Sequence, residues 1–424
     1  MADAAPPVEG GFAAWADLDS HRRWLLAEGQ RLLDHYGGAR VPAGFATLGN
    51  DGTMVDDTAQ GIITARMVHC YALASLMGVP ATAPLADHAL DALLDGPLRD
   101  RRHDGWFADA SGSSRKKAYL HAFVALAGAS AAMAGRPRGT ELLQAAARVI
   151  DERFWIAGEE VLQPSFAADW TDPEAYRGAN CCMHGTEACL ALADATGEDR
   201  WLDRALSLAR RFGHDIPSAH DGRLPEHFDP DWTLLPDYGA DLPTDDTRPF
   251  GLTPGHFAEW AGLLLKVEAA CLTRGRTAPE WLLGDAVRLF DNAMAHGWAP
   301  DGKPGMVYTI DWADRVSVPN RAYWVQAETA NTALMLMRRT GEARYEGVYR
   351  MVWDYIAATL IDRTAGGWRQ EVDADGTLSG VVYPTREDLY HDFQATVIPL
   401  IPVSASVAGG LRAQHSERID RLAA

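Results

Sequence analysis

The feature that most constrains the fold is a helical hairpin that recurs along the chain. Its clearest copies turn at Gly197 and Gly341, inside the similar runs Thr-Gly-Glu-Asp-Arg-Trp and Thr-Gly-Glu-Ala-Arg-Tyr. In each copy a helix rich in Ala and Leu stops at a C-cap glycine, and the next helix starts with an aromatic residue. Weaker copies turn at Gly78, Gly135 and Gly275, so successive turns lie 57, 62, 78 and 66 residues apart. Such a period predicts a series of packed helical hairpins.

Apolar residues at helical spacing predict twelve helices. They cover residues 12–36, 57–78, 85–96, 117–134, 138–155, 182–197, 199–213, 257–274, 277–296, 322–340, 342–361 and 389–410. An open solenoid of hairpins needs polar caps at its ends, but the last helix is as apolar as the middle ones. We therefore expect an all-α fold in which six hairpins close into a toroid. We expect one domain over residues 1–424, with residues 1–11 as a flexible N-terminus.

The connections between the hairpins are rich in Gly, Asp and aromatic residues. The run Asp373-Ala374-Asp375-Gly376 predicts the turn of a short β-hairpin. The longest connection, residues 214–252, is rich in Asp and Pro, and a connection of that length in a compact protein is usually functional. We expect short β-hairpin loops at one end of the toroid and an ordered functional loop over 214–252.

Charge and cysteine content exclude several classes of function. The formal charge of -19 would repel the phosphates of a nucleic acid, so no nucleic-acid partner is expected. No apolar run is long enough to cross a membrane, and the N-terminus lacks the basic and apolar regions of a signal peptide. The five cysteines are odd in number and in no framework spacing, which favours reduced thiols in a cytoplasmic protein. The sequence makes no prediction of the oligomeric state.

The stretch 253–260 carries the first candidate catalytic residue. Thr253 is a good N-cap and Pro254 suits the first helical position, which puts His256 in the first turn with Glu259 one turn further on the same face. The positive end of the helix dipole disfavours an imidazolium there, and a neutral imidazole can act as a general base. Glu259 can fix the tautomer of this ring or bind a substrate hydroxyl. The alternative is a capped surface helix with an incidental histidine.

Two more histidines stand near predicted helix starts. His184 follows Asn180, a plausible N-cap, and has Glu187 three residues later. His391 follows the run 385–388, in which Thr and Asp have the spacing of a capping box, so we expect His391 in the second turn of its helix. If the three helices are equivalent, their histidines face the same end of the ring. Polar residues are common at helix starts, so the residues alone leave a purely structural role open for each histidine.

Two further patterns have both a functional and a structural interpretation. Arg66 lies inside an apolar helix, where a charged side chain is rarely buried without a partner. It can bind a ligand oxygen or pair with Glu187 or Glu259. Trp324 and Glu328 share one helical face. A tryptophan face with polar neighbours suits sugar binding and ordinary core packing equally.

A metal site is the alternative use of these histidines. His184 and His256 each begin a His-x-x-Glu pattern, whereas helical di-iron proteins use the reverse order with additional glutamates. The sequence has no His-Glu-x-x-His, Cys-x-x-Cys or EF-hand motif, and no phosphate-binding or dinucleotide-binding glycine motif. We expect neither a metal nor a cofactor.

Together these motifs resemble the N-acylglucosamine 2-epimerase superfamily, and within it the branch of the mannose and sulfoquinovose isomerases. The motifs that carry the resemblance are Tyr176-Arg177-Gly178, Asn180, Met183-His184, Thr253-Pro254-Gly255-His256, Glu259-Trp260, Trp324 with Glu328, and Tyr390-His391. Thr64-Ala65-Arg66-Met67, Glu226-His227-Phe228-Asp229 and Gln370-Glu371-Val372-Asp373 also fit that branch. The likeness runs from about residue 20 to residue 410.

The resemblance implies an (α/α)6 barrel that interconverts an aldose and its ketose without a metal or nucleotide cofactor. It makes His256 and His391 the catalytic pair. It assigns the pocket to Arg66, Asn180, His184, Glu259, Trp324 and Gln370, with Tyr119 and Phe123 as further lining residues. On chemical grounds we assign ring opening to His256, transfer of the carbon-bound proton to His391, and stabilisation of the enediolate to Arg66.

Two departures from the sulfoquinovose isomerases bear on the substrate, a monosaccharide. Ile62 stands where a pocket tryptophan is expected in those enzymes, and Gln326 is the residue expected in mannose isomerases and epimerases. A sulfonate at C6 also needs charged donors, for which Arg177 and Arg248 are the candidates. The favoured function is isomerisation of D-mannose, or of a similar aldose such as D-lyxose, with D-fructose as the ketose of mannose. The alternatives are a sulfoquinovose isomerase, a sugar 2-epimerase of the mannose, N-acylglucosamine or cellobiose type, and a non-catalytic ring that binds a protein partner.

Overall fold

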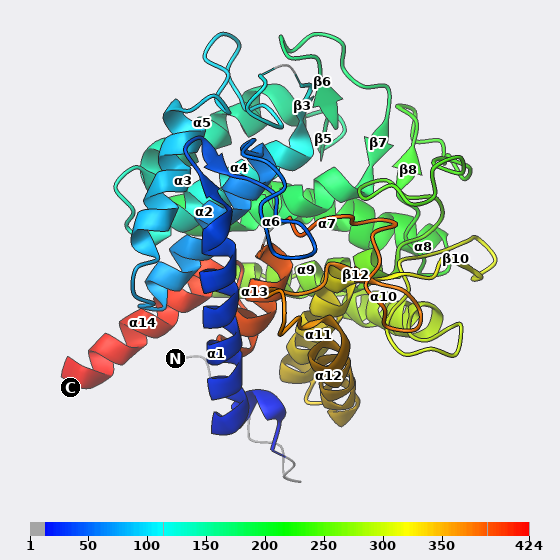
Figure 1. Ribbon diagram of the computed structural model, residues 1–424. Coiled ribbons are helices and arrows are strands. Elements are labelled where there is room, and N and C mark those ends of the chain that lie inside the picture. The colour runs from blue at the N-terminus through cyan, green and yellow to red at the C-terminus, as the bar shows by residue number, and fades with distance from the viewer. Residues whose placement is uncertain (1–12, 113, 388, 424) are drawn as a thin grey trace.

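Two concentric rings of helices make up the barrel in the computed structural model, which describes residues 13–423 except 113 and 388 (Figure 1). The inner ring consists of α2 (Gly61–Leu76), α4 (Ala118–Met133), α6 (Ala179–Thr196), α9 (Pro254–Thr273), α11 (Tyr323–Thr340) and α13 (Tyr390–Val397). Each packs against the next, and α13 packs against α2, which closes the ring. The outer partners are α3 (Ala83–Asp95), α5 (Gly139–Val149), α7 (Asp199–Ala209), α10 (Trp281–Gly297), α12 (Ala343–Tyr355) and α1 (Asp19–Tyr36). The predicted toroid of six hairpins, an (α/α)6 barrel, is confirmed.

The two rings differ in sequence because they differ in burial. Almost every residue of α4 is buried, since its neighbours in the inner ring cover two sides and its outer partner covers a third. The outer helix α7 instead buries one stripe, formed by Trp201, Leu202, Ala205 and Leu208, and exposes its other face. Apolar composition around the whole helix therefore marks the inner ring, and amphipathic composition marks the outer ring.

All five predicted hairpin turns are present, and each turn glycine has a left-handed backbone. The φ angles are 79° at Gly78, 65° at Gly135, 75° at Gly197, 66° at Gly275 and 75° at Gly341. A side chain disfavours this conformation, which is why a glycine follows the inner helix in each of these five hairpins. The sixth hairpin has no turn, because it consists of α13 packed against α1 from the other end of the chain.

The outer helices end where periodicity predicts, but with a change of helix type. The predicted segments 138–155, 199–213 and 342–361 correspond to α5, α7 and α12, each followed by a π turn, over Ile150–Phe154, Arg210–Asp215 and Ile356–Leu360. The first helix is shorter than the predicted segment 12–36. The helix α1 begins only at Asp19, after a 3-10 turn over Trp15–Asp17.

The predicted last helix, 389–410, is wrong. The helix α13 ends at Val397, a 3-10 turn covers Ile398–Leu400, and α14 (Val407–Ala423) packs across α2, α4 and α6 before it projects from the barrel (Figure 1). Pro399 and Pro402 break the helix because proline has no amide hydrogen and restricts the residue before it. Arg338 of α11 donates to the carbonyl groups of Ile398, Pro399 and Ile401 at this break.

The starts of α6 and α13 also differ from prediction. The N-cap position of α6 falls on Gly178 and not on Asn180, which is the second helical residue. The N-cap position of α13 falls on Leu389 and not on Thr385, so the predicted capping box does not start this helix, and Asp388 lies outside the described residues. His391 is consequently in the first turn of α13 and not in the second. Thr253 does occupy the N-cap position of α9, although its side chain makes no capping hydrogen bond.

Short antiparallel strand pairs hold the connections at the end of the barrel where the inner helices begin. The strands β3 (Lys116–Lys117), β7 (Arg177–Gly178) and β11 (Arg321–Ala322) lead directly into α4, α6 and α11. They pair with β6 (Ser165–Phe166), β8 (His227–Phe228) and β12 (Glu371–Val372). The other pairs are β1 (Arg40–Val41) with β2 (Gly44–Phe45), β4 (Trp155–Ile156) with β5 (Val161–Leu162), and β9 (Thr309–Ile310) with β10 (Val316–Val318). The long connection also contains the single-turn helix α8 (Ile216–Ala219).

The predicted turn at 373–376 is present, with Val372 bridged to Leu378 and a φ of 81° at Gly376. The division of the chain into one domain over 1–424 stays a prediction, and the predicted flexible segment 1–11 lies outside the described residues. No helix in the part of the chain that the structure describes is both long and apolar enough to cross a membrane.

Candidate active site

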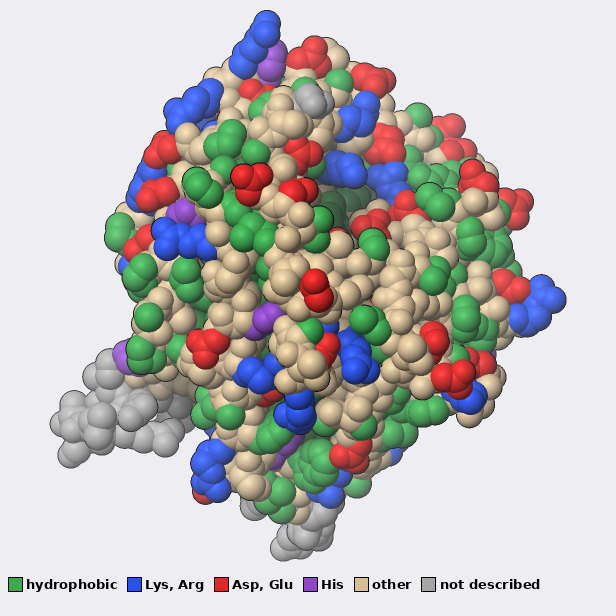
Figure 2. All heavy atoms as spheres, in the orientation of Figure 1, with side chains coloured by type: hydrophobic (Ala, Val, Ile, Leu, Met, Phe, Trp, Pro, Cys, Tyr) green, Lys and Arg blue, Asp and Glu red, His purple; other side chains and the backbone are tan. Residues whose placement is uncertain are grey.

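A cavity of about 230 Å³ lies at the end of the barrel where the inner helices begin. Every inner helix contributes to its wall: Arg66 from α2, Tyr119 from α4, Asn180 and His184 from α6, His256 and Glu259 from α9, Trp324 from α11, and His391 from α13. Gln370, from the connection between α12 and α13, completes the set. Figure 2 shows a hollow in this face of the molecule, with basic and acidic side chains around it. Nine of the ten predicted site residues thus line one cavity.

His256 and His391 each pair with a buried glutamate. Nδ1 of His256 lies 2.8 Å from Oε2 of Glu226, and Nδ1 of His391 lies 2.8 Å from Oε1 of Glu328. A carboxylate at Nδ1 favours the neutral tautomer in which Nε2 has the free lone pair. Each ring can therefore accept a proton at Nε2. The partner of His256 is Glu226 from the connection 214–252, and not Glu259, the partner suggested by the sequence.

Glu226 is held as an anion by its histidine. Burial alone would raise the pKa of this carboxyl group, but the charge of His256 and its hydrogen bond lower the pKa below the ordinary glutamate value. Glu226 is only 2% exposed, so its charge acts on His256 with little screening by water.

Trp324 packs close to both histidines. Its ring centroid is 5.0 Å from that of His256 and 6.0 Å from that of His391. Its Nε1 donates a hydrogen bond of 2.9 Å to Oη of Tyr383, whose hydroxyl also donates to the Asp246 carbonyl at 3.2 Å. The indole thus forms an ordered apolar wall beside two groups that can transfer protons.

Arg66 is held against aromatic rings on another part of the wall. Its Nη2 donates to Oη of Tyr119 at 3.0 Å, and its guanidinium carbon lies 4.2 Å from the ring centroid of Phe123. Phe123, the tenth predicted residue, therefore lies behind Arg66 and not on the cavity surface. The sequence suggested Glu187 or Glu259 as the partner of Arg66, whereas the structure packs its guanidinium against these rings.

His184 lies between two carboxyl groups. Its Nδ1 is 3.9 Å from Oε1 of Glu259 and 4.0 Å from Oε2 of Glu187. Burial lowers the pKa of His184 to about 4, so the ring is neutral at pH 7. Glu187 has its own cation, Lys266, with Nζ at 3.5 Å from Oε1, and it accepts a hydrogen bond from the Tyr390 hydroxyl.

Two amide side chains present unpaired polar atoms to this region. Nδ2 of Asn180 donates to the carbonyl of Thr247 at 2.8 Å. Oδ1 of Asn180 and Nε2 of Gln370 are buried and have no hydrogen-bond partner among the described residues. One is an acceptor and the other a donor, and buried groups of this kind are normally paired, so both fit a ligand with hydroxyl groups.

Several lining residues were not predicted from the sequence. They are Gln60, Ala108, Arg115, Lys117, Leu120, Asp246, Thr247, Tyr323, Tyr383 and Glu387. Two of them, Asp246 and Thr247, belong to the connection 214–252. The length of this connection predicted a functional loop, although not these residues. Ile62 lines the cavity as expected. Gln326 does not line it: its amide pairs with the backbone of Met306, accepting at 3.0 Å and donating at 2.9 Å.

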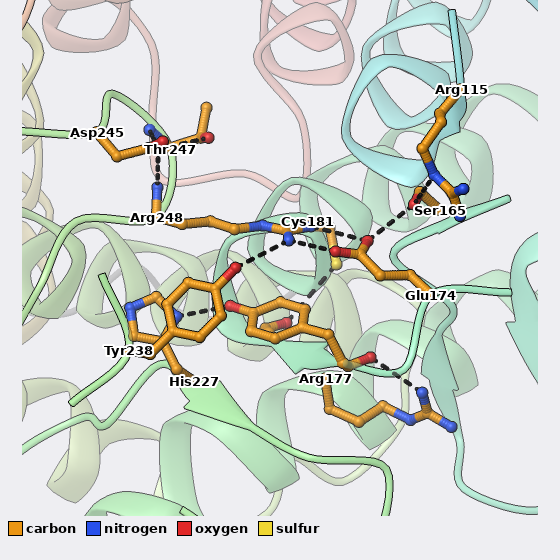
Figure 3. A network of polar contacts seen from close by, with 12 residues as sticks. Arg115, Ser165, Glu174, Arg177, Cys181, His227, Tyr238, Asp245, Thr247 and Arg248 are labelled. Atoms are coloured by element: carbon orange, nitrogen blue, oxygen red, sulfur yellow. Dashed lines mark hydrogen bonds and ion pairs between the residues drawn. The ribbon is translucent and has the colours of Figure 1, made fainter. Parts of the chain in front are cut away.

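A wider cavity of about 950 Å³ adjoins the first and shares Arg115, Lys117, Tyr119, Asn180 and Thr247 with it. Arg248 crosses this second cavity to Glu174, with hydrogen bonds of 2.6 and 3.2 Å (Figure 3). Arg177 lies apart from Arg248 in the same view (Figure 3). It pairs with Glu159 through two hydrogen bonds of 2.8 Å. Both arginines considered for a C6 sulfonate are thus paired with carboxylates.

The described residues contain no group of three or more His, Cys, Asp or Glu side chains placed to hold a metal ion. The expectation of a reaction without a metal or cofactor stays a prediction. All five cysteines are buried free thiols, and a cytoplasmic location likewise stays a prediction.

Comparison with known proteins agrees with this geometry. Residues 44–395 match the family model described as N-acylglucosamine 2-epimerase. The chain is 46% identical over 404 residues to a D-mannose isomerase of Pseudomonas cannabina pv. alisalensis, covering 94% of this chain and 97% of that protein. It is 46% identical over 412 residues to a D-mannose isomerase of Thermobifida fusca, covering 94% and 98%. A crystal structure of D-mannose isomerase superposes with a TM-score of 0.82 at 26% identity, covering 92% of this chain and 99% of that chain. The chain belongs to the N-acylglucosamine 2-epimerase family.

Proposed function

We propose that the protein is an aldose–ketose isomerase that interconverts D-mannose and D-fructose. The observation that carries the proposal is the pair of His256 and His391, each with Nδ1 on a buried glutamate and both on the wall of one small cavity. The names of the two relatives that are 46% identical to the chain support mannose as the substrate.

Isomerisation needs an open-chain sugar, a base at carbon and a stabiliser for the enediolate oxygens. His256 opens the ring and transfers hydroxyl protons. His391 removes the proton from C2 and returns it to C1. Arg66, 5% exposed against its aromatic neighbours, stabilises the negative charge that develops on O1 and O2. In this scheme the two glutamates keep Nε2 of each histidine ready to accept a proton.

The other wall residues fit a sugar ligand. Hydroxyl groups both donate and accept hydrogen bonds, which matches the free acceptor atom of Asn180 and the free donor atom of Gln370. Trp324 offers an apolar face of the kind that packs against the C–H groups of a sugar. The cavity, about 230 Å³, is of a size for a small molecule.

A neutral group at C6 is favoured over a sulfonate. Arg177 and Arg248 are paired with Glu159 and Glu174, so neither is free to balance a new anion. The basic residues that do line the cavity share its wall with acidic ones, among them Asp246 and Glu387. A fully ionised sulfonate would therefore lose its hydration without a surplus of positive charge to replace it.

A sugar 2-epimerase is the second candidate, and the presence of two histidines on the wall of one cavity favours it. If both reach C2 from opposite faces, the proton returns on the other face and mannose gives glucose. If only His391 reaches carbon, the proton moves to C1 and mannose gives fructose.

Product analysis separates these outcomes. Wild-type protein is incubated with mannose in D2O, and the sugars are separated and analysed by NMR. We expect fructose and no glucose, and a lower kcat/KM for sulfoquinovose than for mannose. His256→Ala and His391→Ala should lose turnover, whereas His214→Ala, a histidine paired with Asp285 outside the cavity, should retain it. Glucose as the main product, or a preference for sulfoquinovose, would contradict the proposal.

A further inference from the structure

Glu259 is a carboxyl group on the cavity wall with no cation in contact. Its side chain is buried, with 8% of the residue exposed. Within the described residues the carboxyl group makes no hydrogen bond, and Nδ1 of His184, 3.9 Å away, is its only basic neighbour at ion-pair distance. His184 is itself neutral at pH 7 because burial lowers its pKa to about 4. A charge on Glu259 would therefore be buried without compensation.

The charged groups around Glu259 already have other partners. Lys266, on the same helix, pairs with Glu187 at 3.5 Å, and Glu328 pairs with His391 at 2.8 Å. Arg66 is held against Phe123 and Tyr119. The two nearby glutamates are thus placed as anions, and a third negative charge between them would be repelled.

The remaining titratable neighbours add no positive charge. Tyr119 of α4 and Tyr390 of α13 are buried, and burial raises the pKa of both, so they remain neutral phenols. His256, one turn earlier on α9, has its partner in Glu226. None of these neighbours, as far as the structure describes the chain, gives Glu259 a cation of its own.

We propose that Glu259 is a neutral carboxylic acid in the empty pocket at neutral pH, and that it donates a hydrogen bond to an oxygen of the bound sugar. An isolated buried carboxylate is so costly that such a group takes up a proton instead. Burial, followed by the charges of Glu328 and Glu187, raises the pKa of Glu259 well above the ordinary glutamate value, against smaller opposing effects of Lys266 and Arg66. The sugar as acceptor rests on the proposed function, whereas the protonation does not.

A neutral acid suits the chemistry better than an anion would. The enediolate carries negative charge on its oxygens, and a carboxylate in the same small cavity would oppose that charge. A carboxylic acid contributes an O–H donor at a point where charge develops. Glu259 would act beside Arg66, with one donor neutral and the other cationic.

Infrared difference spectroscopy tests the protonation without reference to any substrate. The spectrum of Glu259→Gln is subtracted from that of wild type at pH 7. We expect the carbonyl stretch of a protonated carboxyl group in wild type and its loss in the variant. Glu187→Gln is the matched control, because the same change on an ionised residue should remove carboxylate bands only. If Glu259→Gln removes carboxylate bands instead, the proposal is wrong.

Kinetics test the hydrogen bond to the sugar. The amide of Glu259→Gln is a neutral donor of similar size, so its kcat/KM should stay within about tenfold of wild type, while Glu259→Ala should lose about 100-fold or more because the donor is gone. Equal loss in the two variants would overturn the donor role. A protein inactive on every aldose would remove the proposed function but leave the infrared result unchanged.

Stability against pH gives a second readout of the protonation. A glutamate in the unfolded chain ionises near its ordinary pKa of about 4.3. Above that pH the folded protein still holds the proton on Glu259, so wild-type stability falls as pH rises towards the raised folded-state pKa. Glutamine has no such dependence. The midpoint of urea unfolding of Glu259→Gln, relative to wild type, should therefore increase with pH from about 4.3 upward. A difference that is constant with pH would contradict a neutral Glu259.

Discussion

The charge and role of each buried glutamate in this site depend on the group with which it pairs. Glu226 holds His256, Glu328 holds His391, and Glu187 holds Lys266. Glu259 pairs with none of these groups and lines the cavity. Four glutamates of the same type can thus differ in charge and role, because their surroundings differ.

The role of Glu226 can be tested by removing its charge. In Glu226→Gln the amide no longer enforces donation from Nδ1 of His256, so kcat should fall by about 100-fold or more. Glu159→Gln is the control, since Glu159 makes a similar charged pair with Arg177 outside the cavity lining. Steady-state kinetics on mannose, with melting curves to confirm folding, give the comparison. A kcat within about twofold of wild type would show that Glu226 does not support catalysis by His256.

Local signals allowed the histidines to be predicted but not their partners. His256 stands near a helix start that Thr253 and Pro254 reveal in the sequence, whereas the N-cap expected at Asn180, before His184, falls on Gly178. Glu226 lies 30 residues before His256 in the connection 214–252, just before β8, and only the folded backbone brings the two together. The sequence therefore suggested Glu259, which is close in the chain but is not the partner of the ring.

The secondary-structure elements repeat because each of the six inner helices packs against an outer helix in the same way. Each inner helix must stop and reverse within a few residues, and a left-handed glycine does this with local geometry alone. This is why five hairpins could be predicted. The sixth could not be found in the same way, because its two helices lie at opposite ends of the chain. The break after α13 was missed, although Pro399 and Pro402 were visible in the sequence.

The hairpin turns give a prediction at the scale of elements. Gly197 has a φ of 75°, and a Cβ added there would meet no atom within 4 Å, so Gly197→Ala should lose about 1 kcal/mol from backbone strain alone. Gly347 is exposed in the middle of α12, also with open space around it. Gly347→Ala should therefore gain up to about 1 kcal/mol from helix propensity.

Urea unfolding of the two variants measures both effects in the same protein. Neither added Cβ meets another atom, so packing cannot explain a difference between the two variants. Opposite signs of the change in unfolding free energy would therefore show the effect of backbone conformation. Destabilisation by both substitutions would mean that the turn glycine is not the reason for the repeat.

At the scale of the whole molecule, the site depends on ring closure. His391 is on α13, an eight-residue helix that packs against α1, so residues from both ends of the chain fix its position. Closure could be predicted from the apolar last helix, and the resemblance to a known family supported it. The arrangement of the six inner helices around one cavity could not be read from any local pattern, because it depends on packing between segments far apart in sequence.

Ring closure can be disturbed at Gly29, where α1 meets α13. A Cβ at this position would lie 2.8 Å from Oγ1 of Thr396 and 3.4 Å from Cε2 of Phe393, both on α13. Gly29→Leu should therefore destabilise the protein by about 1–3 kcal/mol through overpacking. It should also lower kcat more than it raises KM, because α13 carries His391 and the other inner helices carry most of the binding wall.

Gly38→Leu is the matched control, since Gly38 is exposed, belongs to the turn after α1 and has no atom within 4 Å of an added Cβ. Its stability should stay within about 0.5 kcal/mol of wild type, and its kinetics on mannose should be normal. If Gly29→Leu lost stability but kept full kcat, the position of His391 would not depend on the packing of α1 against α13. The catalytic geometry would then be set by the inner ring alone, and closure by the first helix would serve only to stabilise the fold.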